Sequence, residues 1–164
     1  MANPVAEVRG LTKRFGERTV LSGLDLTVER GEFVALLGRS GSGKSTLLRV
    51  LAGLDGAVEG SVEVTGTVSV AFQQPRLLPW RKVWRNVVLG LRQDGVAKSR
   101  NRALAEKALA EVHLAEHADD WPLTLSGGEA QRVSLARALV REPGLLSMSR
   151  SVIYEQLRSG RLRS

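Results

Sequence analysis

Short apolar runs predict five strands in the first half of the chain. They lie at residues 5–9, 25–28, 33–37, 61–64 and 67–72, mostly bounded by glycine or polar residues that favour turns. The run at residues 33–37 is apolar throughout, which is typical of a strand buried on both faces of a parallel sheet. Residues 45–54 follow with helical spacing. A strand, a glycine-rich turn and a helix are therefore predicted in succession.

The spacing becomes helical between residues 83 and 118, and a further helix is predicted at 128–140. One apolar stripe, predicted to be core rather than partner surface, recurs every three or four residues: Leu104, Ala108, Val112 and Ala115. His113 and His117 follow four residues apart on the predicted last turn. Such a pair can bind a metal, but no carboxylate-histidine constellation surrounds it, so we expect solvent-facing histidines.

Composition narrows the classes of protein without defining one. A chain of 164 residues predicts one compact unit. The sequence has no run of 18 apolar residues, so no membrane span is predicted. The first five residues lack the features of a secretion signal, and the absence of cysteine fits a reducing compartment. The net charge of +7 permits nucleic-acid binding. The charges are dispersed without interleaved aromatics, so no nucleic-acid partner is expected.

One glycine-rich segment has the spacing G-x-x-x-x-G-K-[ST] of a phosphate-binding loop. It lies at the predicted strand-to-helix junction: Gly38, Arg39, Ser40, Gly41, Ser42, Gly43, Lys44, Ser45 and Thr46. Glycines let the backbone turn tightly and direct several N–H groups to one concave surface. In such a loop Lys44 would lie against the β- and γ-phosphates, and the Ser45 hydroxyl would reach Mg²⁺. The segment predicts a triphosphate site rather than a plain turn.

A second motif precedes the predicted helix at 128–140. It reads Leu125-Ser126-Gly127-Gly128-Glu129-Ala130-Gln131-Arg132. Ser126 and Glu129 have the spacing of a helix cap, but capping does not explain the whole string together with a phosphate loop upstream. The string closely resembles the signature motif of ABC-transporter ATPases, and the resemblance extends over residues 8–146.

The resemblance implies an α/β P-loop fold of the ABC ATPase type. Residues 1–146 would form a partial ATP-binding domain with a mixed sheet and a helical subdomain at about 83–135. ATP and Mg²⁺ are the implied cofactors. In this family the signature residues, here Ser126, Gly127 and Gly128, touch the γ-phosphate of ATP held by a second ATPase subunit, which implies a homodimer. A helix N-terminus with free N–H groups suits that contact.

Two further segments match the family in order. Phe15 matches the aromatic residue that stacks on adenine, and residues 71–80 resemble the glutamine loop. Gln73 would reach Mg²⁺ and the attacking water, so Lys44 and Gln73 are the catalytic candidates. The stretch from Gln73 to Trp80 would face two integral-membrane permease subunits at the cytoplasmic face of the membrane, with a solute-binding protein as an indirect partner.

Residues 38–40, 76–80 and 120–122 look most like importers of aliphatic sulfonates, with nitrate and taurine importers close behind.

The resemblance fails after Leu146. Family members continue there with Asp-Glu-Pro, whose carboxylates hold Mg²⁺ and polarise the attacking water. Here Glu155 is the only acidic residue after Glu142. We therefore expect the aliphatic strand to stop at Leu146, followed by an aberrant basic tail at 147–164. The strand at 33–37 would lose its ladder partner, with residues 152–154 available to fill part of the gap. The product would be marginally stable and impaired in hydrolysis.

We hypothesise a one-base frameshift, in the gene or in its sequencing, at about Leu146. Codons CTC GAT GAG CCG TTC GGT encode Leu-Asp-Glu-Pro-Phe-Gly, and loss of the first base yields Ser-Met-Ser-Arg-Ser-Val, which is the sequence of residues 147–152. Three readings stay open: the ATP-binding subunit of an importer, a non-hydrolytic nucleotide-binding module, and a fragment without function. The signature motif argues against a fourth, a small-molecule kinase.

Overall fold

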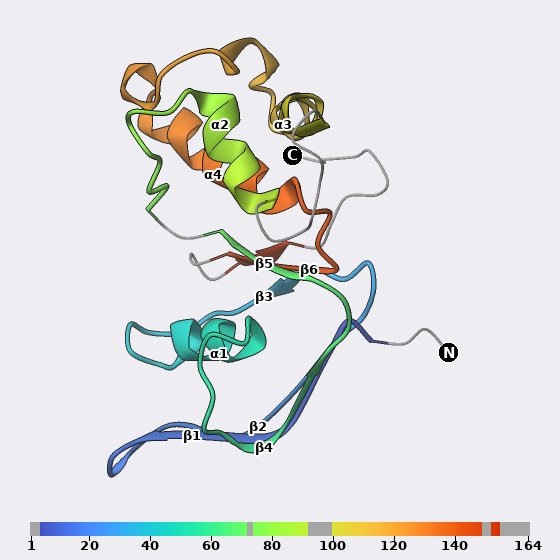
Figure 1. Ribbon diagram of the computed structural model, residues 1–164. Helices are drawn as coiled ribbons and strands as arrows, with labels where there is room; N and C mark the ends of the chain where they lie inside the picture. Colours follow the sequence, from blue (N-terminus) through green and yellow to red (C-terminus); the bar gives the residue numbers. More distant parts are fainter. Residues whose placement is uncertain (1–3, 72–73, 92–99, 149–151, 155–164) are drawn as a thin grey trace. The chain divides into compact units, whose positions relative to one another are not determined.

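The computed structural model describes residues 4–71, 74–91, 100–148 and 152–154 of the 164-residue chain. The chain divides into two compact units (Figure 1). The first comprises residues 1–70 and 143–164, and the second comprises residues 71–142.

A three-stranded antiparallel sheet forms the N-terminal part of the first unit. It consists of β1 (Ala6–Phe15), β2 (Arg18–Val28) and β4 (Glu59–Val64), in the order β2-β1-β4. The strands predicted at 5–9 and 25–28 are the far ends of a long hairpin. Its tip is a tight turn between Phe15 and Arg18, in which Gly16 has a φ of 58°. That left-handed conformation suits glycine.

A second sheet has four short strands in the order β3-β7-β6-β5: β3 (Val34–Ala35), β7 (Val152–Tyr154), β6 (Leu145–Met148) and β5 (Val68–Ala71). The strand predicted at 33–37 is reduced to two residues, and Phe33 and Leu37 are exposed. The prediction of a strand buried on both faces is therefore wrong for this segment.

Two features of this sheet concern the segment after Leu146. The prediction that the strand ends at Leu146 is wrong, because β6 continues to Met148. Residues 152–154 fill the gap beside β3 as expected. As β7 they pair antiparallel with both β3 and β6. Backbone pairing needs no carboxylate, and valine, isoleucine and tyrosine favour strands.

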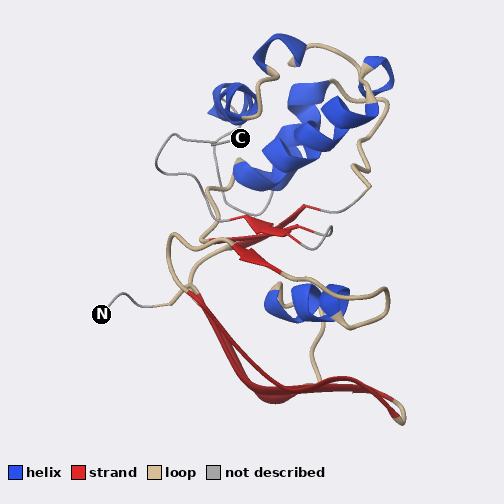
Figure 2. Ribbon diagram, turned by 180° about the vertical axis from the view of Figure 1, so that it is seen from behind, coloured by secondary structure: helices blue, strands red, loops and turns tan. Residues whose placement is uncertain are grey.

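Helix α1 (Lys44–Leu51) lies between the two sheets in both views (Figures 1 and 2). It ends earlier than the predicted residue 54 because Gly53 adopts a left-handed φ of 66°. The N–H groups of Gly53 and Leu54 then donate to the carbonyls of Val50 and Arg49, a Schellman motif. The buried core of this unit comprises Val5, Ala6, Val8, Leu11, Leu21, Val28, Leu47, Leu48, Val50, Leu51 and Leu145.

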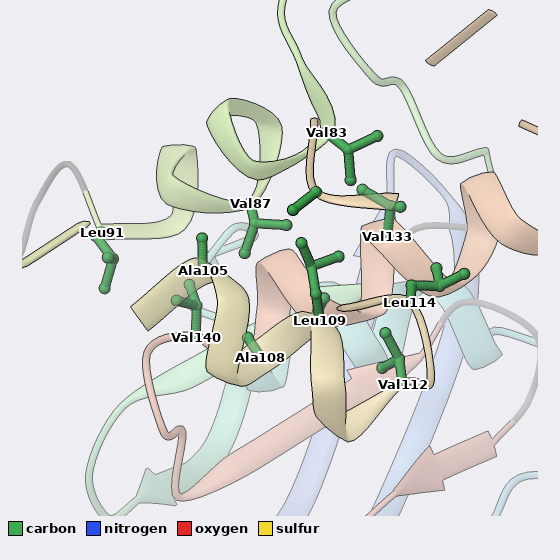
Figure 3. Close-up of a cluster of buried hydrophobic side chains, with 12 residues drawn as sticks. Val83, Val87, Leu91, Ala105, Ala108, Leu109, Val112, Leu114, Val133 and Val140 are labelled. Atoms are coloured by element: carbon green, nitrogen blue, oxygen red, sulfur yellow. The ribbon is translucent and has the colours of Figure 1, made fainter. Parts of the chain in front are cut away.

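The described part of the second unit is helical. It contains α2 (Val83–Val87), η1 (Val88–Leu91), α3 (Asn101–Glu111), η3 (Ala115–His117), η4 (Pro122–Thr124) and α4 (Gly127–Leu139). Figure 3 shows side chains from α2, α3 and α4 converging on one apolar cluster. Its buried members are Val83, Val87, Leu91, Ala105, Ala108, Leu109, Val112, Leu114, Ala118, Val133, Ala136 and Val140.

Two predictions in this region are corrected. Ala115 is exposed, and Ala105 and Leu109 are buried instead, because α3 ends at Glu111 and the helical period stops there. His113 and His117 therefore do not share a helical turn. Burial of Val112 and Leu114 turns the chain at His113, whose φ is 57°. His113 is exposed, whereas His117 is half-buried with its Nδ1 2.7 Å from Asp120 Oδ2.

Candidate nucleotide-binding site

The glycine-rich loop curves around the side chain of its own lysine. Lys44 Nζ donates hydrogen bonds to the carbonyl oxygens of Gly38 at 2.7 Å and Arg39 at 2.8 Å, and it lies 3.1 Å from Ser42 Oγ. Gly38, Arg39, Ser40, Gly41 and Ser42 are all exposed. The loop therefore places one ammonium group at the centre of a solvent-facing ring of backbone.

Two glycines of the loop leave no room for a side chain. A Cβ on Gly38 would lie 2.8 Å from Ser42 Oγ and 3.8 Å from Lys44 Nζ. A Cβ on Gly43 would lie 2.8 Å from Leu21 Cδ2 and 2.9 Å from the carbonyl oxygen of Val20. The first glycine keeps the space around the lysine free, and the second lets the loop pack closely on β2.

Helix α1 begins inside the loop and points its N-terminus at the same space. Gly43 is the N-cap, with a φ of 90°, and no side chain among the described residues caps this end. The first N–H groups of a helix lack partners within the helix and carry partial positive charge. Ser45 is exposed on the first turn and Thr46 is half-buried beside it. The loop, the lysine and the helix end together form an anion site.

Phe15 lies at the tip of the β1–β2 hairpin and is 51% exposed. The ammonium of Lys13 lies 5.1 Å from the centre of the Phe15 ring. Lys13 is itself buried and ion-paired with Asp55 at 2.7 Å. This pair was not predicted from the sequence. Its one signal was that Leu11, Lys13 and Phe15 share a strand face by their spacing of two.

The second catalytic candidate, Gln73, lies outside the described residues. The segment after it is held within the second unit by Arg137 of α4. The guanidinium donates to the carbonyl oxygens of Pro75 at 2.7 Å and Arg76 at 3.2 Å. Burial lowers the pKa of Arg137. Helix α4 thus positions the residues that follow Gln73.

The other end of α4 carries the second motif. Ser126 is the N-cap, and the exposed Gly127 and Gly128 form the first turn, so the structure brings these three residues together. The capping box is complete: Ser126 N–H donates to Glu129 Oε2 at 2.7 Å, and Glu129 N–H donates to Ser126 Oγ at 3.3 Å. Hydrogen bonding to the carboxylate by the Ser126 backbone, and to a lesser degree by the Ser126 side chain, lowers the pKa of Glu129. A Cβ on either glycine would meet nothing within 4 Å, so the space before this turn is open.

No cluster of three or more His, Cys, Asp or Glu side chains suited to a metal occurs in the described ranges. Strand β6 carries Ser147, a residue that is 0% exposed. Its hydroxyl has no hydrogen-bond partner among the residues that the structure describes. In the same part of the chain, every helix is too short or too polar to cross a bilayer.

A glycine-rich loop between a strand and a helix, with its lysine turned into the loop, defines a P-loop nucleotide-binding protein. The sequence profile described as "ABC transporter" matches residues 21–148. The chain therefore belongs to the ABC transporter family.

Curated relatives and solved structures agree with this assignment. Aliphatic sulfonates import ATP-binding protein SsuB 2 of Frankia alni is 68% identical over 139 residues, which cover 85% of this chain and 54% of the relative. SsuB 1 of Streptomyces avermitilis is 61% identical over 145 residues, which cover 88% of this chain and 54% of the relative. The chain spans about half the length of these relatives.

An inward-facing metal-chelate type ABC transporter superposes with a TM-score of 0.80 and 28% identity, covering 89% of this chain and 59% of that one. For cbiO1 from Clostridium perfringens the TM-score is 0.79 at 24% identity, covering 89% and 65%, and this likeness shows the fold alone.

Proposed function

We propose that this chain is the ATP-binding subunit of an ABC importer and that it binds Mg-ATP at the loop of residues 38–46. The observation that carries the proposal is the position of Lys44, whose ammonium lies at the centre of the exposed loop and against the N-terminus of α1. An ammonium and free helix amides on one concave surface are the chemistry that a polyphosphate requires.

The residues present fit a nucleoside triphosphate. The loop amides and Lys44 would hold the phosphates, and Phe15 offers an exposed ring at the hairpin tip for a base. Ser45 would supply a hydroxyl to Mg²⁺, with Gln73 as a second ligand. When bound, ATP and Mg²⁺ would supply the phosphoryl group and the charge that stabilises its transfer.

Isothermal titration calorimetry with Mg-ATP tests the site by measuring the affinity of the chain for the nucleotide. Lys44→Ala removes a charged donor worth about 1.5–3 kcal/mol, so affinity should fall by about 10- to 100-fold. Lys107→Ala is the matched control, because Lys107 lies in the second unit and pairs with Glu142 at 2.9 Å. Equal affinities in the two variants would contradict the proposal.

A specific observation favours a second function for this chain, a nucleotide-binding module that hydrolyses ATP poorly. By the alignment with the neighbouring reading frame, Met148 stands where the family has its Mg²⁺-binding aspartate, and Ser149 stands where it has its catalytic glutamate. A thioether and an uncharged hydroxyl cannot hold Mg²⁺ and polarise water as two carboxylates do. Turnover should therefore be lower by at least about 10²- to 10⁴-fold than in an intact relative.

Restoring the carboxylates tests this impairment. The double variant Met148→Asp with Ser149→Glu should raise ATP hydrolysis above background, whereas Met148→Asn with Ser149→Gln, which has nearly the same shape, should not. Turnover of the unaltered chain equal to that of an intact relative would refute the impairment.

The proposed solute, partners and location of this chain follow from the names of its relatives. We propose an aliphatic sulfonate as the imported solute, two permease subunits contacted near residues 73–80, and a homodimer at the cytoplasmic face of the membrane. The test is sulfonate-dependent stimulation of the restored variant after reconstitution with the permease and binding protein of one genome. Stimulation by nitrate alone would assign a different solute.

We also propose that the sequence after Leu146 reflects a change of reading frame. The family match ends at residue 148, two positions beyond that point. The nucleotide sequence decides: codons that fail to encode Asp-Glu-Pro in the neighbouring frame would end this proposal.

A further inference from the structure

Lys13 is a buried cation in the described part of the first unit, and the proposed ATP site does not use it. This residue lies on β1 and is 5% exposed, while Phe15, two residues further along the same strand face, is 51% exposed. A buried lysine is uncommon unless it is paired. The lysine and the ring on which a base would stack are thus neighbours that differ sharply in solvent access.

The ammonium of Lys13 is fixed from one side. Lys13 Nζ pairs with Asp55 Oδ1 at 2.7 Å and donates to the carbonyl oxygens of Gly56 and of Ala57, the latter at 3.3 Å. On another side it faces the Phe15 ring, 5.1 Å from the ring centre. A desolvated cation held at that distance attracts the ring through the ring quadrupole.

The same lysine lies close to the phosphate loop along the sheet. Its partner across the β1–β2 ladder is Leu21. The Leu21 side chain and the Val20 carbonyl form the surface against which Gly43 packs. Phe15 is therefore tied to the loop through two adjacent strands, at the end of the hairpin beyond Lys13. This arrangement places a base platform within the same rigid sheet that supports the phosphate site.

We propose that Lys13, held by Asp55, is a positioning residue that fixes and polarises the Phe15 ring for stacking on a purine base. A cation beneath one face draws π-electron density toward itself. The open face then carries less negative potential and stacks more strongly on an electron-rich base. The inference rests on the proposed ATP-binding function and deepens it.

Binding of Mg-ATP and of magnesium tripolyphosphate to the full chain separates this role from a structural one. Lys13→Gln is neutral but still able to donate to the two carbonyl oxygens. It should weaken Mg-ATP by about 3- to 10-fold and leave tripolyphosphate unchanged. Lys13→Arg, which keeps a cation, should restore Mg-ATP affinity. Lys13→Met with Asp55→Asn is the second neutral variant, chosen so that no carboxylate is left unpaired, and should behave like Lys13→Gln.

Phe15→Ala provides the coupling test, because the ring is required for the effect. In that background Lys13→Gln should have no further effect on Mg-ATP affinity. Equal losses for Mg-ATP and tripolyphosphate, or an undiminished effect of Lys13→Gln without the ring, would show that Lys13 only pins the loop at residues 55–57. Unchanged Mg-ATP affinity in Lys13→Gln would also overturn the inference. Failure of the unaltered chain to bind Mg-ATP would instead refute the proposed function.

Discussion

Gly41 and Gly43 lie in the same loop, but an added methyl group would meet different surroundings at each. Both have left-handed φ angles, 80° and 90°. A Cβ on Gly41 meets nothing within 4 Å, whereas one on Gly43 would strike Leu21 and Val20 at under 3 Å. Gly41→Ala should therefore cost about 1–2 kcal/mol of backbone strain, and Gly43→Ala a further 1–3 kcal/mol, roughly, from overpacking.

Chemical denaturation followed by far-UV circular dichroism measures this difference. Tryptophan fluorescence would not, because Trp80, Trp84 and Trp121 all lie in the second unit. Equal losses of unfolding free energy at the two positions would show that strain alone matters.

Individual residues also show which structural features could be predicted from the sequence and which could not. The loop of residues 38–46 could be predicted because its glycines and lysine are local and their spacing is specific. The burial of Lys13 could not, since its partner Asp55 is 42 positions away (55 minus 13). A lysine in a strand looks solvent-facing until the loop that covers it is known.

At the scale of elements, helix α4 depends on its first turn. Ser126→Ala removes the acceptor of the Glu129 N–H and should destabilise the second unit by about 1 kcal/mol. Ser126→Asp keeps an acceptor at the N-cap and serves as the control. Denaturation followed by tryptophan fluorescence reports this unit, and an alanine variant as stable as the aspartate variant would contradict the role of the cap.

A pH-dependent contact lies beside the same turn. Hydrogen bonding to Asp120 is the main cause that raises the pKa of His117 above 6.5, with smaller contributions from the charges of Asp120, Glu129 and Glu116. The protonated ring thus stabilises the folded unit below pH 6.5, and this stabilisation is lost as the pH rises through the raised pKa.

His117→Gln should therefore lower the denaturation midpoint most near pH 6 and least near pH 8, roughly. The exposed His113, replaced by glutamine, is the control. A midpoint difference that does not change with pH would exclude the ion pair as its cause.

The exposed edge of the second sheet affects how the whole molecule associates with other copies of itself. Strand β3 is an edge strand, and Leu37 just beyond it is 88% exposed. An apolar sheet edge promotes association between chains. Leu37→Gln should raise the temperature at which light scattering begins. Leu123→Gln, at a position 83% exposed in η4, should have a smaller effect. The opposite order would place the association surface elsewhere.

The sequence also predicts marginal stability for the whole chain. Strand β7 supplies backbone partners to β3 and β6, but it is only three residues long. We expect a broad thermal transition, and a sharp cooperative one at ordinary growth temperatures would contradict this expectation.

The sequence by itself determined the family and the local chemistry of two short motifs, because a glycine-rich phosphate loop and a helix N-terminus are built from residues adjacent in the chain. The tertiary structure alone decided which strand lies beside β3, which lysine lies under Phe15, and how far the strand that begins at Leu145 continues. Those features depend on backbone pairing and burial between segments far apart in the chain, and no local pattern encodes them.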